Sequence, residues 1–526
     1  MGLKHNDRID LTIVDGLFIL LSIVLIVSMN HAVVLLEPFL MVYCLLRMLF
    51  SISFKWTSSI LAFIIAAFCL YELSQGYIQL FQKLGVSRGQ DTIIGSFSNS
   101  GPFGCFLSAC SSLFVAAYFK TTKHFIKISS LVLAVLSVLL LTCTLSRAAM
   151  LAFAVSMVFM AMKWKKTGAL IRKYWVYISL IAVLLGVGAY LIKKPSADGR
   201  MFMARIGLRI MKENGLSGVG LGNYAGAYGK AQADFFAEYL DNGSDPLAID
   251  NIPENLRMVA DCPSFAFNEY MRIGIEAGPI AMLLFVGLII AGILSAYRSE
   301  NYWCYPLIAI SVFACFSYPF EVGVLVFLLT VCLAANETIN MAKRKSIMFY
   351  ILCFLVFGSI YYTRYSLISN LEFGCRPLRV KAKEFCCNRC KRYLVYGCDS
   401  VPDGIYDEKM LFAFGQSLNK SGNYFGSDSF LKIGAEVSSD PMFWNVMGNN
   451  SFAQGNYREA ESRYKHAFTM VPNRLYPLYL LAKLYYAEVD TLHFRDMAER
   501  VEKFKPKVQS INTERLRTEI QELYCE

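Results

Sequence analysis

Long apolar runs, repeated along the first two thirds of the chain, constrain its fold more than any other feature. A helix needs about 20 mostly apolar residues to cross the hydrocarbon core of a bilayer. Eleven stretches are expected to do so: 10–30, 32–50, 56–75, 102–119, 125–146, 148–163, 174–192, 273–296, 303–318, 320–338 and 346–364. The sequence therefore predicts an all-α protein whose residues 1–366 form a polytopic bundle of about 11 transmembrane helices.

The composition agrees with a membrane protein. Hydrophobic residues make up 56% of the 526 residues and charged residues 17%, with a mean hydropathy of +0.43, whereas a soluble chain has about 25% charged residues. The net charge is +11, but no soluble stretch combines a basic patch with aromatic residues, which argues against nucleic-acid binding. The first apolar run lacks a small-residue cleavage pattern, so we expect a retained helix rather than a signal peptide.

The basic residues orient the predicted helices. With the N-terminus in the cytoplasm, every short loop on that side contains Lys or Arg, as the positive-inside rule requires. The loop after the second run, for example, supplies Arg47 and Lys55. Because the number of helices is odd, segments 76–101 and 193–272 and the C-terminal region then lie on the opposite side of the membrane.

The segment 193–272 is too polar for lipid and too long for a passive connection, since loops beyond about 12–15 residues are usually functional. Within it, GRMFMARIGLRIMKENG predicts a helix that ends at Asn214-Gly215. The GVGLGNY sequence that follows has no preceding soluble strand, so a tight turn at the membrane surface is favoured over a dinucleotide-binding loop.

Several arginines at or beside this loop suit an anion. Arg205 and Arg209 share one face of the predicted helix, and Arg200 lies just before them. Guanidinium groups bind phosphate oxygens in a bidentate way; the alternative is a solvated basic face paired with Glu213 and nearby acids. Arg147 lies in an apolar setting between the fifth and sixth runs, where a charge either serves a function or extends to the interface.

Two other outer segments contain candidate functional groups. The turn GSFSNSGPFG (Gly95–Gly104) leaves backbone N–H groups before a membrane helix, and these face a phosphate or simply form a turn. Asn268, Glu269 and Glu276 lie where the large loop re-enters the membrane, the two acids on one helix face. Such a carboxylate acts as a general base on a hydroxyl or compensates a helix N-terminus. Glu321, at the start of the tenth run, has the same two interpretations.

These segments, in this order, resemble the O-antigen ligase and O-antigen polymerase superfamily of bacterial inner-membrane proteins. The resemblance covers about residues 1–366 and rests on GSFSNSGPFG, TLSRAAMLAF, GRMFMARIGLRIMKENGLSGVGLGNYAGAYGKAQ, FNEYMRIGIEAGPIAMLL and FSYPFEVGVLVFLL. It implies a polytopic glycosyltransferase of the GT-C type that needs no metal ion or cofactor. The enzyme would transfer a glycan from undecaprenyl diphosphate on the periplasmic side. The acceptor hydroxyl would belong to lipid A–core in a ligase, to the growing polysaccharide in a polymerase, or to a protein in an oligosaccharyltransferase.

The resemblance also implies roles for individual arginines. Arg147, from the Ser-Arg motif, and Arg200, from the Gly-Arg motif, match best the arginines that hold the donor diphosphate in the family. Arg205 and Arg209 match less closely.

The general base departs from the family pattern. Ligases often have a histidine one to three positions before the Asn of the Asn-Glu-Tyr motif, but here these positions are Phe265–Phe267, and the large loop contains no histidine. We therefore expect Glu269, Glu276 or Asp261 to act as the base, or the good leaving group to need little help. The departure weakens a ligase interpretation more than a polymerase one.

Residues 367–526 are soluble in character and contain a repeat. The stretch Trp444–Pro472 fits the 34-residue tetratricopeptide pattern, with a weaker unit on each side. We expect a periplasmic helical solenoid that binds a protein partner or caps the membrane domain. A non-catalytic scaffold for envelope assembly is the alternative for the whole chain, and a transporter is disfavoured because the apolar runs show no charged relay. In an oxidising compartment disulfides are favoured among Cys375, Cys386, Cys387, Cys390, Cys398 and Cys525.

Overall fold

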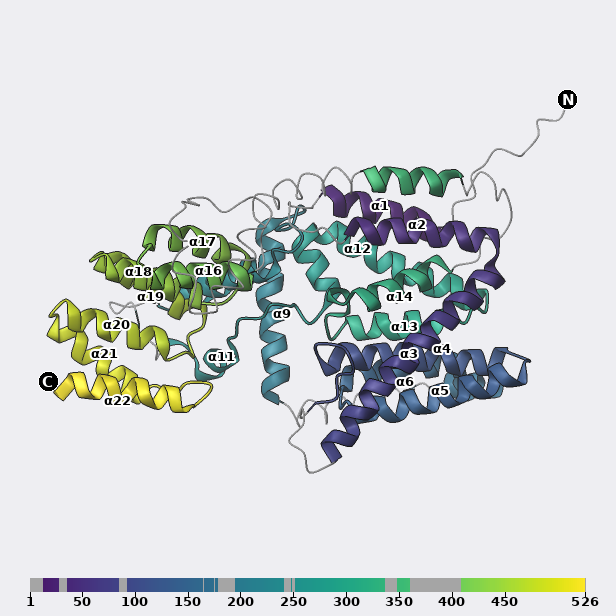
Figure 1. Ribbon diagram of the computed structural model, residues 1–526, viewed down its shortest axis with the longest axis horizontal. Coiled ribbons are helices and arrows are strands. Elements are labelled where there is room, and N and C mark those ends of the chain that lie inside the picture. The colour runs from purple at the N-terminus through teal and green to yellow at the C-terminus, as the bar shows by residue number, and fades with distance from the viewer. Residues whose placement is uncertain are drawn as a thin grey trace.

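The computed structural model describes residues 13–27, 36–84, 92–163, 165–174, 176–177, 194–240, 247, 251–335, 348–359 and 408–525. Every regular element within these residues is a helix. Figure 1 shows three parts along the longest axis: a bundle of apolar helices at one end, helix α9 standing across the middle, and a stack of C-terminal helices at the other end.

Ten apolar helices in the described part of the chain coincide with the expected membrane segments, which indicates a multi-pass membrane protein. The four that are long enough to cross a membrane are α3 (Phe54–Leu84), α4 (Ser100–Lys120), α5 (His124–Cys143) and α12 (Glu269–Arg298). The shorter ones are α1 (Ile13–Val27), α2 (Leu36–Ile52), α6 (Arg147–Ala161), α13 (Cys304–Ala314), α14 (Gly323–Ala334) and Met348–Ser359. The helix expected at 174–192 falls almost wholly outside the described residues.

Helix α3 is longer than the sequence predicts, because it continues to Leu84 instead of ending near residue 75. At Gly76 the helix approaches α5 so closely that a Cβ atom would lie 2.5 Å from the side chain of Leu140. One residue on, the Tyr77 hydroxyl donates a hydrogen bond to the carbonyl oxygen of Leu136 at 2.9 Å. Packing against the neighbouring helix thus extends α3 into the sequence that was predicted as an outer loop.

The charge pattern predicts Arg47 in a cytoplasmic loop, and this prediction is wrong. Arg47 lies inside the bundle with 1% of its side chain exposed. Its Nε and Nη2 donate to the carboxylate of Asp15 in α1 at 2.9 and 2.8 Å, and its Nη1 donates to the carbonyl oxygen of Ala334 at 3.0 Å. The hydroxyl of Tyr43 also donates to Asp15, at 2.8 Å. Removing one partner of such a buried pair costs about 3–5 kcal/mol, so these contacts hold α1, α2 and α14 together.

The large loop is a folded unit with its own hydrophobic core. It contains α9 (Lys194–Asn214), α10 (Tyr224–Leu240) and α11 (Glu254–Val259). Helix α9 ends at Asn214, followed by Gly215 with φ +60°, which confirms the predicted stop. In the core of the loop, Phe202 and Ile206 of α9 pack with side chains of α10 and with Ile275 of α12. The α10 side chains are Tyr228, Phe235 and Phe236.

The C-terminal helices stack as successive pairs (Figure 1). They are α16 (Glu408–Lys420), α17 (Tyr424–Val437), α18 (Met442–Ala453), α19 (Tyr457–Met470), α20 (Tyr476–Ala487), α21 (Thr491–Lys503) and α22 (Ile511–Cys525). Within the α18–α19 pair, a Cβ at Gly448 would lie 2.3 Å from the Tyr464 ring, so the glycine permits the close approach. The tetratricopeptide assignment stays a prediction. The cysteines from Cys375 to Cys398 lie outside the described residues, and Cys525 is a free thiol.

Candidate functional site

An aromatic cluster joins three segments that are far apart in the sequence. The side-chain amide of Asn99, in the turn before α4, donates to the hydroxyl of Tyr318 at 2.8 Å. The ring of Tyr318, between α13 and α14, stacks on Phe265 with centroids 4.3 Å apart. Phe267, just before α12, meets the same ring edge-on. The turn before α4, the end of the large loop and the α13–α14 connection therefore share one site.

One candidate arginine, Arg200, lies at this cluster, and a second, Arg147, acts on its charge. Nη1 of Arg200 in α9 donates to the carbonyl oxygen of Phe316 at 3.2 Å, and its guanidinium lies 5.1 Å from the centroid of the Phe267 ring. Burial, together with the nearby positive charge of Arg147 at the start of α6, lowers the pKa of Arg200. Arg200 forms no ion pair with any residue that the structure describes. Of the four candidate arginines, the two that match the family best therefore lie within electrostatic reach of each other.

The other two candidate arginines have partners within the loop. The guanidinium of Arg209 forms ion pairs with Glu213, one turn along α9, and with Glu238 of α10, each at 2.8 Å. The guanidinium of Arg205 lies over the ring of Phe235, 5.0 Å from its centroid. Both arginines therefore join α9 to α10, and the solvated-face interpretation describes Arg209.

The first residues of the turn before α4 have their N–H groups bound by side chains of α3, as expected if this segment simply forms a turn. The buried carboxylate of Glu72 accepts hydrogen bonds from the backbone N–H of Ser96, at 3.0 Å, and from its hydroxyl. The side-chain oxygen of Gln79 accepts from the N–H groups of Ile94 and Gly95, each at 2.9 Å. These donors are used to fix the turn on α3, so the structural interpretation describes this part of the motif.

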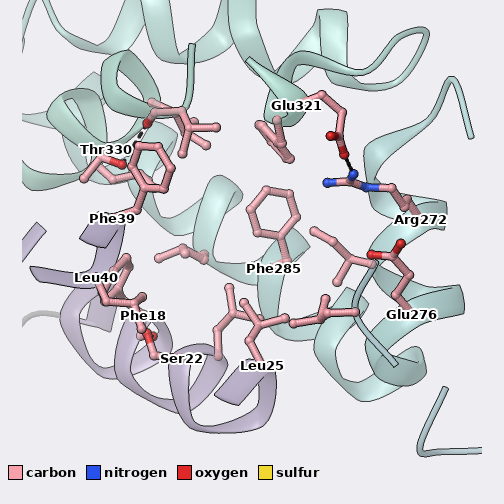
Figure 2. Close-up of a pocket in the computed structure, with 18 of the residues that line it drawn as sticks. Phe18, Ser22, Leu25, Phe39, Leu40, Arg272, Glu276, Phe285, Glu321 and Thr330 are labelled. Carbon is pink, nitrogen blue, oxygen red and sulfur yellow. Dashed lines mark hydrogen bonds and ion pairs between the residues drawn. The ribbon is translucent and has the colours of Figure 1, made fainter. Parts of the chain in front are cut away.

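A largely apolar cavity of about 340 Å³ lies between α1, α2, α12 and α14. Figure 2 shows aliphatic and aromatic side chains around most of it, among them Phe18, Leu25 and Phe285. Arg272 and Glu321 lie together at one end, joined by an ion pair. A cavity of this kind suits a molecule with an apolar body and a polar end.

Arg272 is the residue of this site that sequence reasoning missed. Besides Glu321 it pairs with Glu269, whose Oε2 lies 2.8 Å from its Nε. The available signal was its place three residues after Glu269, on the same helix face. Its pairing with Glu321, which comes from the α13–α14 connection, has no local signature in the sequence.

Two of the predicted catalytic residues hold the start of α12. Oδ1 of Asn268 accepts a hydrogen bond from the N–H of Met271 at 3.0 Å and caps the helix. Oε1 of Glu269, with 1% of the side chain exposed, accepts from the N–H of Phe320 at 3.0 Å. Both groups therefore fix the geometry around the cluster.

The third predicted catalytic residue, Glu276, receives the glycine-rich turn GVGLGNY. Its carboxylate accepts from the N–H of Tyr224 at 3.3 Å, and its carbonyl oxygen accepts from Gly220 at 2.8 Å. Helix α12 is kinked two residues later at Gly278, which has φ +88° and precedes Pro279. A Cβ at Gly278 would lie 1.9 Å from the carbonyl oxygen of Leu216. The turn thus packs directly on the kinked backbone.

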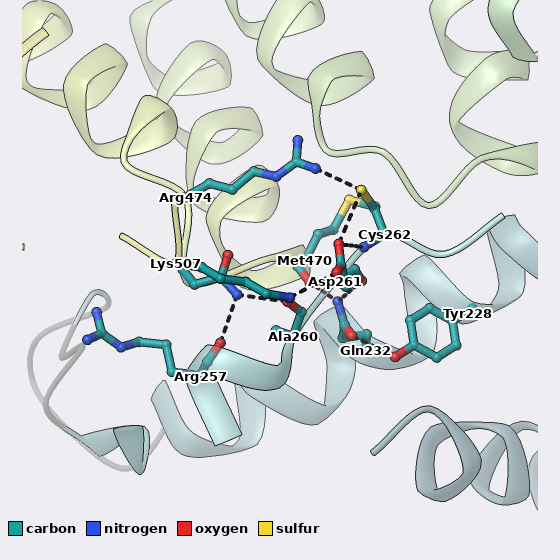
Figure 3. Close-up of polar contacts among 10 residues, drawn as sticks. Tyr228, Gln232, Arg257, Ala260, Asp261, Cys262, Met470, Arg474 and Lys507 are labelled. Atoms are coloured by element: carbon teal, nitrogen blue, oxygen red, sulfur yellow. Dashed lines mark hydrogen bonds and ion pairs between the residues drawn. The ribbon is translucent and has the colours of Figure 1, made fainter. Parts of the chain in front are cut away.

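The C-terminal helices dock on the large loop through polar contacts (Figure 3). The side-chain amide of Gln232 in α10 donates to the carbonyl oxygens of Asp261 and Met470. From the other side, the amide of Asn473 donates to the carbonyl oxygens of Arg257 and Ala260 at 2.9 and 2.7 Å. A loop side chain thus binds a backbone carbonyl of the C-terminal helices, and a side chain of the C-terminal part binds two carbonyls of the loop.

Asp261, the remaining base candidate, belongs to this interface. Its carboxylate forms an ion pair with Lys507 at 2.9 Å (Figure 3). Burial opposes its ionisation, but the hydrogen bond and charge of Lys507 outweigh burial, and the net pKa of Asp261 is lowered. The carboxylate is therefore a docking group.

Comparison with known proteins supports the resemblance seen in the sequence. A family model described as O-antigen ligase matches residues 132–286. This range extends from α5 into α12 and includes Arg147, Arg200, the large loop and the Asn268–Glu276 segment. A search of curated proteins finds no match to the chain. The family match supports the ligase and polymerase superfamily and, with it, glycan transfer in the assembly of envelope polysaccharide.

Proposed function

We propose that this protein, similar in its central part to O-antigen ligases, is a bacterial inner-membrane glycosyltransferase. It transfers a glycan from undecaprenyl diphosphate to an acceptor hydroxyl on the periplasmic side, as in polysaccharide polymerisation or O-antigen ligation. The family match supports the reaction class. The observation that carries the proposal is the position of Arg200, which lies on the Phe316 carbonyl and the Phe267 ring and is within electrostatic reach of Arg147. Arg200 lacks a carboxylate partner within the described residues and feels the charge of Arg147, and a diphosphate bound there would accept hydrogen bonds from Arg200 and offset the like charge.

The apolar cavity supports a lipid-linked donor. The short segment between α13 and α14 reaches both places, since the carbonyl oxygen of Phe316 accepts from Arg200, whereas Phe320 and Glu321 line the cavity. A polyprenyl chain could therefore enter the cavity while its diphosphate lies at the arginine pair. The volume of about 340 Å³ holds only part of such a chain, so the remainder would lie in the surrounding lipid.

The transfer is a substitution at the anomeric carbon of the donor glycan. The acceptor oxygen forms a bond to this carbon as the bond to the diphosphate oxygen breaks, and the hydroxyl proton passes to a base. The undecaprenyl diphosphate leaves with the bonding electron pair. Arg147 and Arg200 stabilise the negative charge that develops on the leaving oxygen, and their fixed positions avoid a reorganisation cost. We propose that the reaction proceeds with inversion and without a metal ion.

We assign the base to Glu321 in preference to Glu269 and Glu276. Glu321 lines the cavity with 37% of its side chain exposed. The carboxylate of Glu269 is almost inaccessible, and Glu276, 4% exposed, is occupied by the glycine-rich turn. The ion pair with Arg272 would orient Glu321 toward the acceptor.

Isosteric replacements separate the two acids that line the cavity. We expect Glu321→Gln to lower the transfer rate by about 10²–10⁴-fold, since this is the usual contribution of a general base. Glu276→Gln keeps a side-chain oxygen that accepts from Tyr224, so we expect transfer within a few-fold of wild type. Rates are measured with purified lipid-linked donor and acceptor. The opposite ranking of the two variants would return the base to Glu276.

Deleting the gene in its source bacterium tests the reaction class. We expect loss of long surface polysaccharide and accumulation of the lipid-linked precursor, both restored by the wild-type gene. Mass analysis of the missing product identifies the acceptor as lipid A–core, growing polysaccharide or protein. An unchanged glycan profile on lipid, polysaccharide and protein would contradict the proposal.

A further inference from the structure

A second cavity, of about 820 Å³, lies between α10 of the large loop and the C-terminal helices α17, α18 and α19. Its volume is in the range of about 300–1,000 Å³ that is typical of small-molecule sites. None of the residues that line it belongs to the arginine pair or to the apolar cavity between the membrane helices. It is therefore a separate candidate site.

Close backbone contact fixes the walls of this cavity. At Gly226 helix α10 lies against α17, where a Cβ would be only 1.7 Å from the carbonyl oxygen of Glu436. One turn on, a Cβ at Gly229 would lie 2.9 Å from the Cα of Ser439. Together with the contacts of Gln232, this leaves α10 little freedom to move relative to the C-terminal helices. The cavity is thus preformed, which lowers the entropic cost of binding.

The inner surface combines aromatic, thioether and imidazole groups. The ring of Trp444 lies 4.2 Å from that of His466, and Met447 and Met470 lie beside them. Burial lowers the pKa of His466, although the charge of Asp234 partly opposes this. A neutral imidazole both donates and accepts hydrogen bonds. Such a surface offers an apolar face for C–H groups next to polar partners for hydroxyls.

The charged residues at the rim of this cavity balance each other, and this indicates which kind of ligand the cavity can bind. Lys230 and Asp234 come from α10, and Lys432 and Glu436 from α17, so each of the two helices contributes one cation and one anion. A strongly anionic or cationic ligand would gain little here, whereas a hydroxyl-rich neutral molecule finds donors and acceptors on both sides. The walls are helices whose backbone groups are already paired, so they offer no strand edge to an extended peptide.

The glycine-rich turn GVGLGNY connects this cavity with the membrane part. Leu221 and Gly222 line the apolar cavity, whereas Val219 and Asn223 line the second one. We propose that the second cavity binds a short, essentially uncharged stretch of the acceptor saccharide and holds it beside the transfer site. The identity of the saccharide as acceptor rests on the proposed function; its binding does not.

Binding is tested on the full-length protein in detergent. The probe is the soluble oligosaccharide that mild acid releases from the surface polysaccharide of the source cell, observed by saturation-transfer NMR and calorimetry. We expect Trp444→Ala to raise its Kd by about tenfold or more, because a stacked aromatic contact contributes that order of affinity. Asp234→Asn, on the exposed rim, tests the same site without touching the core and should raise the Kd several-fold.

Phe425→Ala is the matched control, since Phe425 lies on α17 outside the cavity with 74% of its side chain exposed. Its Kd should equal that of wild type. The proposal fails if wild type does not bind the oligosaccharide, or if Trp444→Ala and Asp234→Asn bind it like wild type. It also fails if the two variants instead lose binding to a pool of periplasmic peptides.

Two readouts separate this inference from the proposed function. Arg200→Ala should bind the oligosaccharide normally although transfer is lost. In a transfer assay, Trp444→Ala should raise the KM for the acceptor and leave kcat and the KM for the donor unchanged. If wild type binds the oligosaccharide but transfers no glycan, the cavity is still a saccharide-binding site and the proposed reaction is overturned.

Discussion

Replacing Arg200 with alanine is expected to lower glycan transfer by at least about 10²–10³-fold, the usual effect of removing one group that stabilises the developing charge. The side chain lies over Phe267 and donates to the carbonyl oxygen of Phe316, and it forms no ion pair with a carboxylate within the described part of the chain. Its loss therefore leaves no carboxylate unpaired, and the protein should fold and insert normally. Transfer is measured with lipid-linked donor, and protein level by immunoblot of membranes.

Arg209→Ala is the matched control, because Arg209 lies on the same helix α9 but pairs with Glu213 and Glu238. We expect its transfer rate to stay within a few-fold of wild type. Arg147→Ala should reproduce the loss caused by Arg200→Ala, and the double variant should be little worse than either, since residues that act as a unit are not additive. Full activity of Arg200→Ala would refute the diphosphate assignment.

The second large effect is expected at Gly278, where Gly278→Ala should both destabilise the protein and abolish transfer. The backbone there, with φ +88° and ψ 163°, is accessible essentially to glycine alone, and other residues pay roughly 1–3 kcal/mol in such a conformation. The added Cβ would also lie 1.9 Å from the carbonyl oxygen of Leu216. Because that clash is with backbone, either the kink or the glycine-rich turn must shift, and Arg272, on the same helix, shifts with it.

Gly287→Ala provides the comparison within α12. A Cβ at Gly287 would meet only the side chain of Leu17, at 3.9 Å, which is ordinary contact. Its stability should change by less than about 1 kcal/mol and in the stabilising direction, since alanine is the better helix former. Thermal unfolding in detergent and the transfer assay are measured on both variants. Equal stability and activity of the two would show that the kink is dispensable.

Much of the fold follows from short-range pattern. Apolar runs predict the helices of the bundle because each run must satisfy its own backbone hydrogen bonds in lipid. The stop of α9 at Asn214-Gly215 follows in the same way, since glycine permits the positive φ that ends a helix. Motif order alone also selected Arg147 and Arg200, which the structure brings together.

The sequence alone is less informative about partners. Arg47 and Lys55 look equivalent in the charge pattern, yet Arg47 is buried against Asp15. The sequence motifs assign no role to Arg272, yet it pairs with acids from two segments. The sequence left Glu276 open as a general base or as compensation of a helix N-terminus, whereas in the structure it accepts a hydrogen bond from the N–H of Tyr224.

What the sequence by itself determined is therefore which segments are helical, which of them are apolar, and which motifs could meet. Only the tertiary structure decided which charges are compensated and which remain for a ligand. The physical reason is that hydropathy and helix signals act over a few residues, whereas a buried charge is stabilised by whatever partner the fold brings within a few ångströms. For Arg200 that partner is a carbonyl oxygen and an aromatic ring rather than a carboxylate, and its charge is left for an anion.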